Sequence, residues 1–450
     1  MAEPVNLWTA GAPTPRHAYV AYIIFDVVLG LPFRWCTSVS EWEQHQGVKV
    51  QYGGTPNADL GAAWIPSSGL LEGNALECPA WNTWSDEEGP GVPGKGRLPF
   101  GVANVADARV DADWWSWVFW AVTRMEEYNA PASAFDGMGR FQATASMAHA
   151  EGWLLRPEVE VRIRAWARAI GLTPEHSTYK VHPTIDVDSA YAYRHRSVWR
   201  TAGAVGKDIV HGRIGRLAER WRVLVRGQHD PYDTYEWLES VHAAHGLKAR
   251  YFFLLADRGP HDTPVHWRQL GMHALVQRLL QSASVGIHPG VASHDSADTA
   301  RLEREVNRLK ELSKAPVQHA RQHFLLQCFP STWRRLEAAG IQHDHSMGYA
   351  DHIGFRAGMS RPYKAFDVAA NRPLDLTIHP TAAMDATLNR YMGLSPEQAL
   401  DALERLAGEV KAVDGELTLL WHNETVSECN EWKGWRSVYE QEVGETRVNK

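Results

Sequence analysis

Thr184-Ile185-Asp186-Val187-Asp188 is the stretch that decides the fold, because a short apolar run ends there in two carboxylates one residue apart. With Tyr179-Lys180-Val181-His182-Pro183 before it, the stretch predicts a buried β-strand that runs out into a loop. Side chains at positions i and i+2 of a strand share one face, so Asp186 and Asp188 are expected to point into one site. Two carboxylates that close repel each other unless a cation lies between them or one is protonated. The alternative is a pair of solvated turn residues that cap the next helix.

Further apolar runs recur downstream of about residue 175, with helical patterns between several of them. Ser395-Pro396-Glu397-Gln398, for example, predicts a helix start with a capping box and a proline at the first helical position. Alternating strands and helices predict a parallel sheet of the α/β class, and the number of units favours a distorted (β/α) barrel. The expected strands are 181–187, 250–256, 285–288, 317–322, 374–379 and 417–422.

The length of 450 residues predicts two domains. We expect a mixed α/β N-terminal domain of unassigned role at 1–172 and the barrel at 173–450, with a basic helical insertion at 190–230. Nine arginines and lysines lie between Arg194 and Arg226, against only Asp208 and Glu219. Such an insertion could hold an anionic substrate, a partner or nucleic acid, and a solvated helix without a ligand is the alternative.

Composition limits the classes of function. A net charge of -7 argues against a general polyanion binder, so no nucleic-acid partner is expected for the whole chain. Among the 20 tryptophans, those at 114, 115, 117 and 120 have helical spacing and predict core packing rather than a carbohydrate-binding surface. The apolar run at 18–31 is too short for a membrane span, and no secretory signal is visible at the N-terminus. We therefore predict a cytoplasmic location.

Polar residues gather at the ends of the predicted strands. At the C-terminal edge of a barrel they would face one crevice although they are far apart in sequence. Any one of them alone is a weak signal, but together they predict an active site. Beyond Asp186 and Asp188, these residues are His288, Arg321, His323, Asp344 and His422.

Several of these segments carry a resemblance to a known family. Thr184-Ile-Asp-Val-Asp188, Gly286-Ile-His-Pro289 and Leu420-Trp-His-Asn423 resemble, in order and spacing, the motifs of polysaccharide deacetylases, which are metal-dependent carbohydrate esterases. A bacterial branch with an extra N-terminal domain is similar in three further segments. They are Arg321-Gln-His-Phe324, Asp344-His-Ser-Met-Gly-Tyr349 and Gly354-Phe-Arg-Ala-Gly358.

The resemblance implies roles for the matching residues. Asp186 would be the catalytic base, oriented by Arg321, and His422 would be the general acid. Asp188 and His288 would bind the metal. The residues expected to bind substrate are Tyr349 and Trp421, as a wall that stacks on the sugar, together with His323, Asp344 and Arg356.

Two positions depart from the family pattern. The family's two aspartates are adjacent, whereas Val187 separates them here. A second ligand histidine normally follows the first by four residues, but Ala292 occupies that position. His294 is the nearest substitute, and Ser293, Asp295 or a water are the alternatives.

Aspartate and histidine ligands suit Zn²⁺, with Co²⁺ or Mn²⁺ as alternatives. The predicted function is a metal-dependent hydrolase of amide bonds that removes acetyl groups, N-acetyl above all, from an amino-sugar-containing glycan or glycoconjugate. One alternative is a metal-dependent amidase that acts on a small molecule other than a sugar. The other is a catalytically silent deacetylase-like module that binds glycan or protein.

Overall fold

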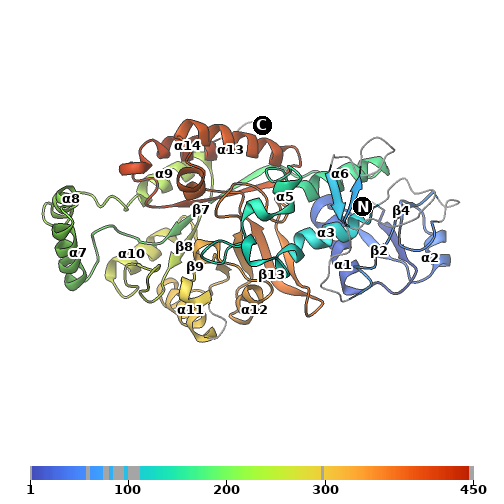
Figure 1. The fold of residues 1–450 in the computed structure, drawn as a ribbon, viewed down its shortest axis with the longest axis horizontal. Helices are drawn as coiled ribbons and strands as arrows, with labels where there is room; N and C mark the ends of the chain where they lie inside the picture. Colours follow the sequence, from blue (N-terminus) through green and yellow to red (C-terminus); the bar gives the residue numbers. More distant parts are fainter. Residues whose placement is uncertain are drawn as a thin grey trace.

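The computed structural model describes residues 3–56, 61–73, 81–84, 96–99, 112–294 and 298–444. Its described residues form a four-stranded sheet near the N-terminus, a nine-stranded sheet downstream and a short antiparallel hairpin of β5 (Trp81–Trp84) and β6 (Gly96–Pro99). Figure 1 shows the two larger sheets at different places along the molecule, with helices around both. The structure thus confirms the expected α/β class, with a distorted (β/α) barrel preceded by a mixed α/β region.

The N-terminal sheet is parallel, with strand order β2-β1-β3-β4. Helix α1 (Pro15–Ala21) begins at Thr14, whose hydroxyl accepts from the His17 amide, and a π-helix at Tyr22–Leu29 follows it directly. Gly30 ends that segment in the left-handed conformation, with φ of 66°. The four strands are β1 (Val5–Thr9), β2 (Phe33–Trp35), β3 (Lys49–Tyr52) and β4 (Ala63–Ile65), and helix α2 (Val39–Gln44) lies between β2 and β3.

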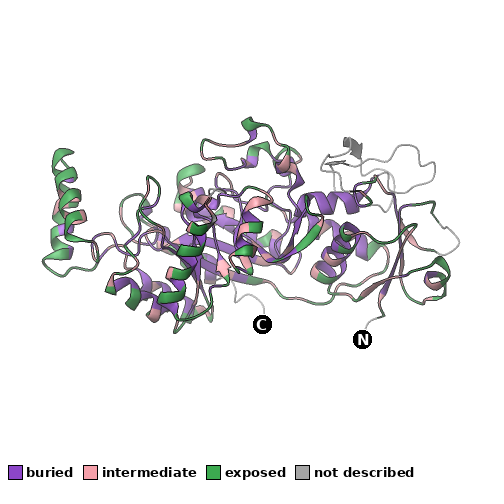
Figure 2. Cartoon of the chain, turned by 90° about the horizontal axis from the view of Figure 1, so that it is seen from below, coloured by how far each residue is buried: buried purple, intermediate pink, exposed green. Residues whose placement is uncertain are grey.

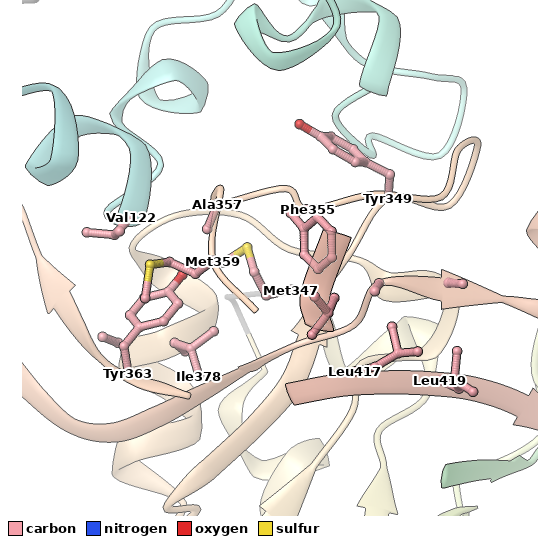
Figure 3. Packing of buried hydrophobic residues seen from close by; sticks show 14 of the residues in the cluster. Val122, Met347, Tyr349, Phe355, Ala357, Met359, Tyr363, Ile378, Leu417 and Leu419 are labelled. Carbon is pink, nitrogen blue, oxygen red and sulfur yellow. The ribbon is translucent and has the colours of Figure 1, made fainter. Parts of the chain in front are cut away.

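Helix α3 (Trp114–Val122) carries the predicted tryptophan cluster. Its four tryptophans are at most 3% exposed, so the prediction of core packing is confirmed. One hydrophobic cluster extends from Val5 to Val443, and Figure 3 shows the part where Val122 lies near Met359 and Tyr363. Because this core is continuous, the domain boundary after residue 172 stays a prediction. Helices α4 (Met125–Tyr128), α5 (Met147–Ala150) and α6 (Glu158–Ala169) complete this part of the chain.

The large sheet has the order β12-β13-β11-β10-β9-β8-β7-β15-β14, and every neighbouring pair is parallel except β12 with β13. Its strands, in chain order, are β7 (Lys180–Val187), β8 (Arg250–Leu254), β9 (Ser284–His288), β10 (His319–Ala320), β11 (His343–Met347), β12 (Tyr363–Asp367), β13 (Arg372–Pro380), β14 (Ala383–Met384) and β15 (Glu416–His422). The sequence predicted β7, β8, β9, β10, β13 and β15, and it missed the other three strands.

A short segment after β13 joins the two ends of the curled sheet. The Thr381 amide donates to the Met347 carbonyl of β11, and the Ala382 amide donates to the Thr418 carbonyl of β15. Gly348 makes room for this crossing, since a Cβ there would lie 2.7 Å from the Thr381 carbonyl oxygen. The carboxyl ends of the parallel strands therefore surround one opening.

Helices cover the outside of the barrel. Helix α13 begins with the predicted capping box, in which the Ser395 hydroxyl accepts from the Gln398 amide and the Gln398 side chain accepts from the Ser395 amide. No helix among the described residues has the length and apolar character needed to cross a membrane. The covering helices are α9 (Tyr235–His245), α10 (Leu270–Leu279), α11 (Thr299–Ser313), α12 (Ser331–Ala338), α13 (Pro396–Lys411) and α14 (Trp435–Gly444).

Two of the helices that follow β7 do not cover the barrel. Helices α7 (Val198–Val210) and α8 (Ile214–Leu224) form a hairpin that projects from the body at the end opposite the N-terminal sheet (Figures 1 and 2). Figure 2 shows that this hairpin is almost entirely exposed. It corresponds to the predicted basic insertion.

Candidate active site

The predicted strand-end residues of β7 and β9 meet at one opening. Asp186 is near the end of β7 and Asp188 follows it on the same face, while His288 is the last residue of β9. Asp186 and His288 are buried, at 2% and 1% exposure, and 28% of the Asp188 side chain is exposed. Asp188 thus lies where solvent can reach a buried polar cluster.

Three side chains converge in a way that suits a metal ion. Asp188 Oδ1 lies 3.3 Å from His288 Nε2, and Asp188 Oδ2 lies 3.4 Å from His323 Nε2. One ligand atom from each of the three residues can be chosen so that all lie within 4.8 Å of one another. Tetrahedral ligands at the usual Zn–N and Zn–O distances would be about 3.3 Å apart. The spacing therefore fits a divalent cation.

The other ring nitrogens of both histidines are already engaged. His288 donates from Nδ1 to the Arg321 carbonyl oxygen at 2.7 Å, and His323 donates from Nδ1 to Asp262 Oδ1 at 2.8 Å. These bonds fix the ring orientation and leave both Nε2 atoms directed at Asp188. Asp188 Oδ1, moreover, is buried and accepts no hydrogen bond. Such a donor set is typical of a metal site.

The electrostatics also favour a cation at this place. Burial alone would lower the pKa of His323, but Asp188 and Asp262 outweigh it and raise the pKa to about 9. Burial would raise the pKa of Asp188, yet His323 and His288 hold it well below its usual range. The carboxylates of Asp188 and Asp262 thus create a negative potential at this place.

The second histidine of this cluster differs from the predicted one. His294 ends the 3-10 turn at Val291–His294, and its Nδ1 lies 3.4 Å from Arg335 Nη2. Burial and Arg335 lower the pKa of His294 to about 4, and it is not part of the cluster. The prediction of His294 as a ligand is therefore wrong, and His323, predicted to bind substrate, occupies that place. Ser293 donates to Glu305 instead, and Asp295 lies outside the described residues.

Asp186 is held by an arginine, as its implied role requires. Arg321 Nη1 donates to Asp186 Oδ1 at 2.9 Å, and Arg321 Nε donates to the His345 carbonyl at 2.9 Å. The guanidinium is fully buried and lies over the Phe252 ring at 4.6 Å. Asp186 Oδ2 remains directed toward the cluster, 3.6 Å from His288 Nε2. A carboxylate in this position can accept a proton from a water bound between Asp188 and the two histidines.

His422, at the end of β15, lies on the other side of Asp188. It donates from Nδ1 to Asp385 Oδ1 at 2.8 Å, while its Nε2 lies 3.9 Å from Asp188 Oδ2. Burial would lower the pKa of His422, but Asp385 and Asp188 raise it to about 10. A pKa raised in this way favours the protonated imidazole, which can give a proton to a leaving group.

These groups line a pocket of about 270 Å³. Its wall and rim include residues from outside the barrel strands, notably Arg140, which precedes β7 by 40 positions. The remaining lining residues include both polar and apolar side chains. In full, they are Asp186, Asp188, His288, His323, Phe324, Leu325, Met384, Ala386, Arg390, Tyr391, Leu420, His422, Glu424 and Thr425.

The other predicted substrate-binding residues do not line this pocket. Trp421 is 1% exposed and packs on Trp435 and Tyr439 of α14, because strand alternation turns it away from the face of Leu420 and His422. These aromatic contacts place it in the core.

Tyr349, Asp344 and Arg356 are buried as well. Tyr349 is 3% exposed and points toward the segments before the barrel (Figure 3). Asp344 accepts from Gln327 at 2.9 Å. Arg356 donates to Glu127 Oε1 and to the Gly348 carbonyl. All three stabilise packing around the site, and a sugar cannot reach them in this conformation.

Two residues that orient site histidines escaped the sequence analysis. Asp262 belongs to the loop after β8, and Asp385 follows the two-residue strand β14. Neither lies at the end of an apolar run long enough to be recognised. His323 could have been identified as the third candidate ligand more easily than Asp262 or Asp385. It follows Arg321, a predicted site residue, by two positions.

Comparison with known proteins gives one family match and several structural similarities. A family of unknown function, DUF7033, matches residues 7–171. No curated protein matches the chain. A protein described as a polysaccharide deacetylase of Mycobacterium smegmatis is 13% identical with a TM-score of 0.42, over 61% of this chain and 86% of that one.

Two further solved structures have similar values. The allantoinase PuuE is 10% identical with a TM-score of 0.39, over 62% of this chain and 90% of that one. A CE4 family pseudoenzyme of Bacillus anthracis is 10% identical with a TM-score of 0.31, over 60% of this chain and 62% of that one. At these identities and TM-scores, the similarities assign no activity to the chain.

Proposed function

We propose that the chain is a metal-dependent hydrolase that removes acetyl groups, N-acetyl above all, from an amino-sugar-containing glycan or glycoconjugate. The observation that carries the proposal is the convergence of three functional groups of residues on one pocket. Asp188 with its two histidines can hold a cation, Arg321 holds Asp186, and Asp385 holds His422. The sequence motifs that resemble polysaccharide deacetylases supply the substrate class.

Asp188, His288 and His323 would hold the ion, with Zn²⁺ first and Co²⁺ or Mn²⁺ next. When bound, such an ion lowers the pKa of a ligated water and polarises a carbonyl group. Asp186 is close enough to take the proton from the attacking water, because its Oδ2 faces the cluster. Arg321 orients that carboxylate through its hydrogen bond to Asp186 Oδ1.

His422 completes the proposed chemistry. In the protonated state set by Asp385, its Nε2 can donate to the leaving amine when the amide bond breaks. Asp186, oriented by Arg321, and His422, oriented by Asp385, thus lie in the same pocket as Asp188, as a base and an acid would. This arrangement argues against a silent binding module, in which neither orienting partner would be needed.

The test measures metal and acetate together. Purified protein would be analysed for bound metal, then assayed for acetate release from acetylated chito-oligosaccharides with Zn²⁺, Co²⁺ or Mn²⁺ added. We expect one ion for each chain and metal-dependent release. Bound metal without release from any acetylated sugar would favour the amidase alternative, and absence of both would contradict the proposal.

A further inference from the structure

The hairpin of α7 and α8 exposes an unusual number of apolar side chains. Of the twelve large hydrophobic residues that are exposed in the described part of the chain, eight lie between positions 198 and 225. Exposed apolar surface that gathers in one place usually marks a binding surface. These residues, called here the apolar hairpin face, are Val198, Trp199, Ile209, Val210, Ile214, Trp221, Leu224 and Val225.

The apolar residues follow helical stripes. On α7, Val198 and Ile209 are separated by 11 positions and lie on one face with Val205 between them, at 80% and 62% exposure for the first two. Ile214 at the start of α8 and Val225, which caps its C-terminus, repeat this spacing at 75% and 67% exposure. Each helix is therefore amphipathic, yet in both the apolar side faces solvent rather than the protein.

The hairpin is also strongly basic. Nine arginines and lysines against two acids give residues 194–226 a charge of +7, whereas the whole chain carries -7, so the rest carries -14. Both acids are already engaged, Asp208 with Arg220 at 2.9 Å and Glu219 with the Tyr193 hydroxyl at 2.6 Å. The surface offered to a partner is thus positive as well as apolar.

These two properties together select the partner. A second copy of the hairpin would cover the apolar hairpin face but would bring two positive surfaces together. Nucleic acid would pair with the arginines but would leave the aliphatic side chains in water. An anionic lipid surface satisfies both, because its phosphates attract lysine and arginine while its acyl boundary accepts apolar side chains.

We propose that the α7–α8 hairpin docks the protein on the surface of an anionic lipid bilayer. The helices lie in the interfacial plane with the apolar hairpin face toward the acyl chains. Trp199 and Trp221, at 87% and 47% exposure, sit at the depth that tryptophan favours in membranes. The basic side chains reach the lipid phosphates from the flanks of the helices.

Co-sedimentation of the full chain with vesicles tests the proposal. One set of vesicles would contain phosphatidylcholine alone, and the other phosphatidylcholine mixed with phosphatidylglycerol. We expect binding to the mixed vesicles, weakened by added salt. Replacing Lys207 and Arg222 by glutamine should weaken binding roughly fivefold for each charge removed. Replacing Trp199 and Ile209 by serine should weaken it by about tenfold or more.

Matched controls separate the hairpin from general effects. Lys248→Gln and Lys433→Gln remove exposed charges elsewhere, and Leu155→Ser removes an exposed apolar side chain. These variants should bind like the parent protein. Circular dichroism of every variant checks that the helices remain. The charge substitutions and the apolar substitutions are independent, so either set tests the proposal if the other fails to fold.

Four outcomes would overturn the proposal. They are absence of binding to the mixed vesicles, binding that the hairpin substitutions leave unchanged, a dimer in lipid-free solution that Ile209→Ser dissociates, and oligonucleotide binding that depends on Lys207 and Arg222 without vesicle binding. None of these measurements depends on hydrolytic activity, so they can fail or succeed independently of the proposed function.

Discussion

Asp188 contacts both histidines of the candidate metal site, one through each carboxylate oxygen. We expect Asp188→Ala to lose the metal while the fold persists, because the side chain is partly exposed and adds little to the core. Metal content by atomic spectroscopy and the far-ultraviolet circular dichroism spectrum check both parts. Asp401→Ala, on the exposed side of α13, is the matched control. Unchanged metal content in Asp188→Ala would refute the ligand assignment.

Asp186 is the residue whose removal should separate chemistry from metal binding. An asparagine keeps the hydrogen bond from Arg321 but cannot accept a proton, so Asp186→Asn should retain the metal and lose roughly 10²- to 10⁴-fold in turnover. Turnover and metal content measured on the same preparation check this. Activity close to that of the parent would exclude Asp186 as the base.

Asp385 should control the pH range over which the acid works. Its carboxylate raises the pKa of His422, so Asp385→Asn should lower that pKa and deprotonate the imidazole at a lower pH. The alkaline limb of the kcat/KM profile would then move toward neutral pH, with the acidic limb unchanged. Profiles of both proteins over the same buffers give the comparison, and an unmoved alkaline limb would contradict the role.

The sequence predicted those site residues that directly end regular strands. Asp186, Asp188 and His288 follow from apolar runs, and the structure brings them to one pocket, although their roles stay predictions. His294 was wrong because the ligand depends on the path of a loop: the turn at 291–294 directs it toward Arg335. Loop geometry of this kind leaves no periodic pattern in a sequence.

Among the elements, β11 shows where pattern recognition stops. His343-Asp-His-Ser-Met347 contains no alternating apolar residues, yet it is a central strand whose Asp344 and Ser346 are fully buried. The Asp344 carboxylate accepts from the Ser346 backbone amide at 3.0 Å and from the Gln327 side chain at 2.9 Å. Tertiary hydrogen bonds replace the hydrophobic signal that normally identifies a strand.

A layer of histidines lies beneath the site on β10, β11 and β13. His319 and His345 lie 3.1 Å apart between ring nitrogens, and His343 and His379 lie 3.0 Å apart. Burial and nearby Arg250 lower the pKa of His319 to about 3, and burial with neighbouring imidazoles holds those of His345 and His379 well below 6.5. These rings are therefore neutral in the folded protein.

Acid should destabilise the barrel through this layer. An unfolded histidine binds a proton below about pH 6.5, whereas the folded rings do not. The free energy of unfolding therefore keeps its neutral-pH value above that pH and decreases as the pH is lowered. Each of these neutral histidines accounts for at most about 1.4 kcal/mol per pH unit. Urea unfolding at pH 7 and pH 5 should show a smaller loss for His379→Gln than for the parent. The exposed His211→Gln should show no such difference.

At the scale of the whole molecule, a buried ion pair connects the N-terminal segment to the barrel. Glu127 of α4 accepts from Arg356 Nε at 2.9 Å and from Arg124 Nε at 2.8 Å. Glu127→Gln should lower the free energy of unfolding by about 3 kcal/mol, because the buried Arg356 loses its counterion and Arg124 keeps only Glu126. Urea unfolding measures the change, and the surface control Glu404→Gln should stay within about 0.5 kcal/mol. A similar small change for both would show that the pair does not stabilise the fold.

The observed fold does not clearly mark the predicted boundary between two domains. A parallel sheet at 5–65 and a barrel from residue 180 onward agree with a change of pattern along the chain. The continuous core and the contribution of Arg140 to the pocket depend on packing between distant segments, which no local pattern encodes.

The pairing of β7 with β15 has a consequence for biosynthesis. Seven residue pairs join them, from Lys180 with Glu416 to Asp186 with His422, across more than half of the polypeptide. While the ribosome is still making the intervening segments, the edge of β7 that pairs with β15 is open and the pocket lacks His422. The strand order therefore predicts that the nascent chain exposes an aggregation-prone strand edge until β15 has emerged, a state in which chaperones would protect it.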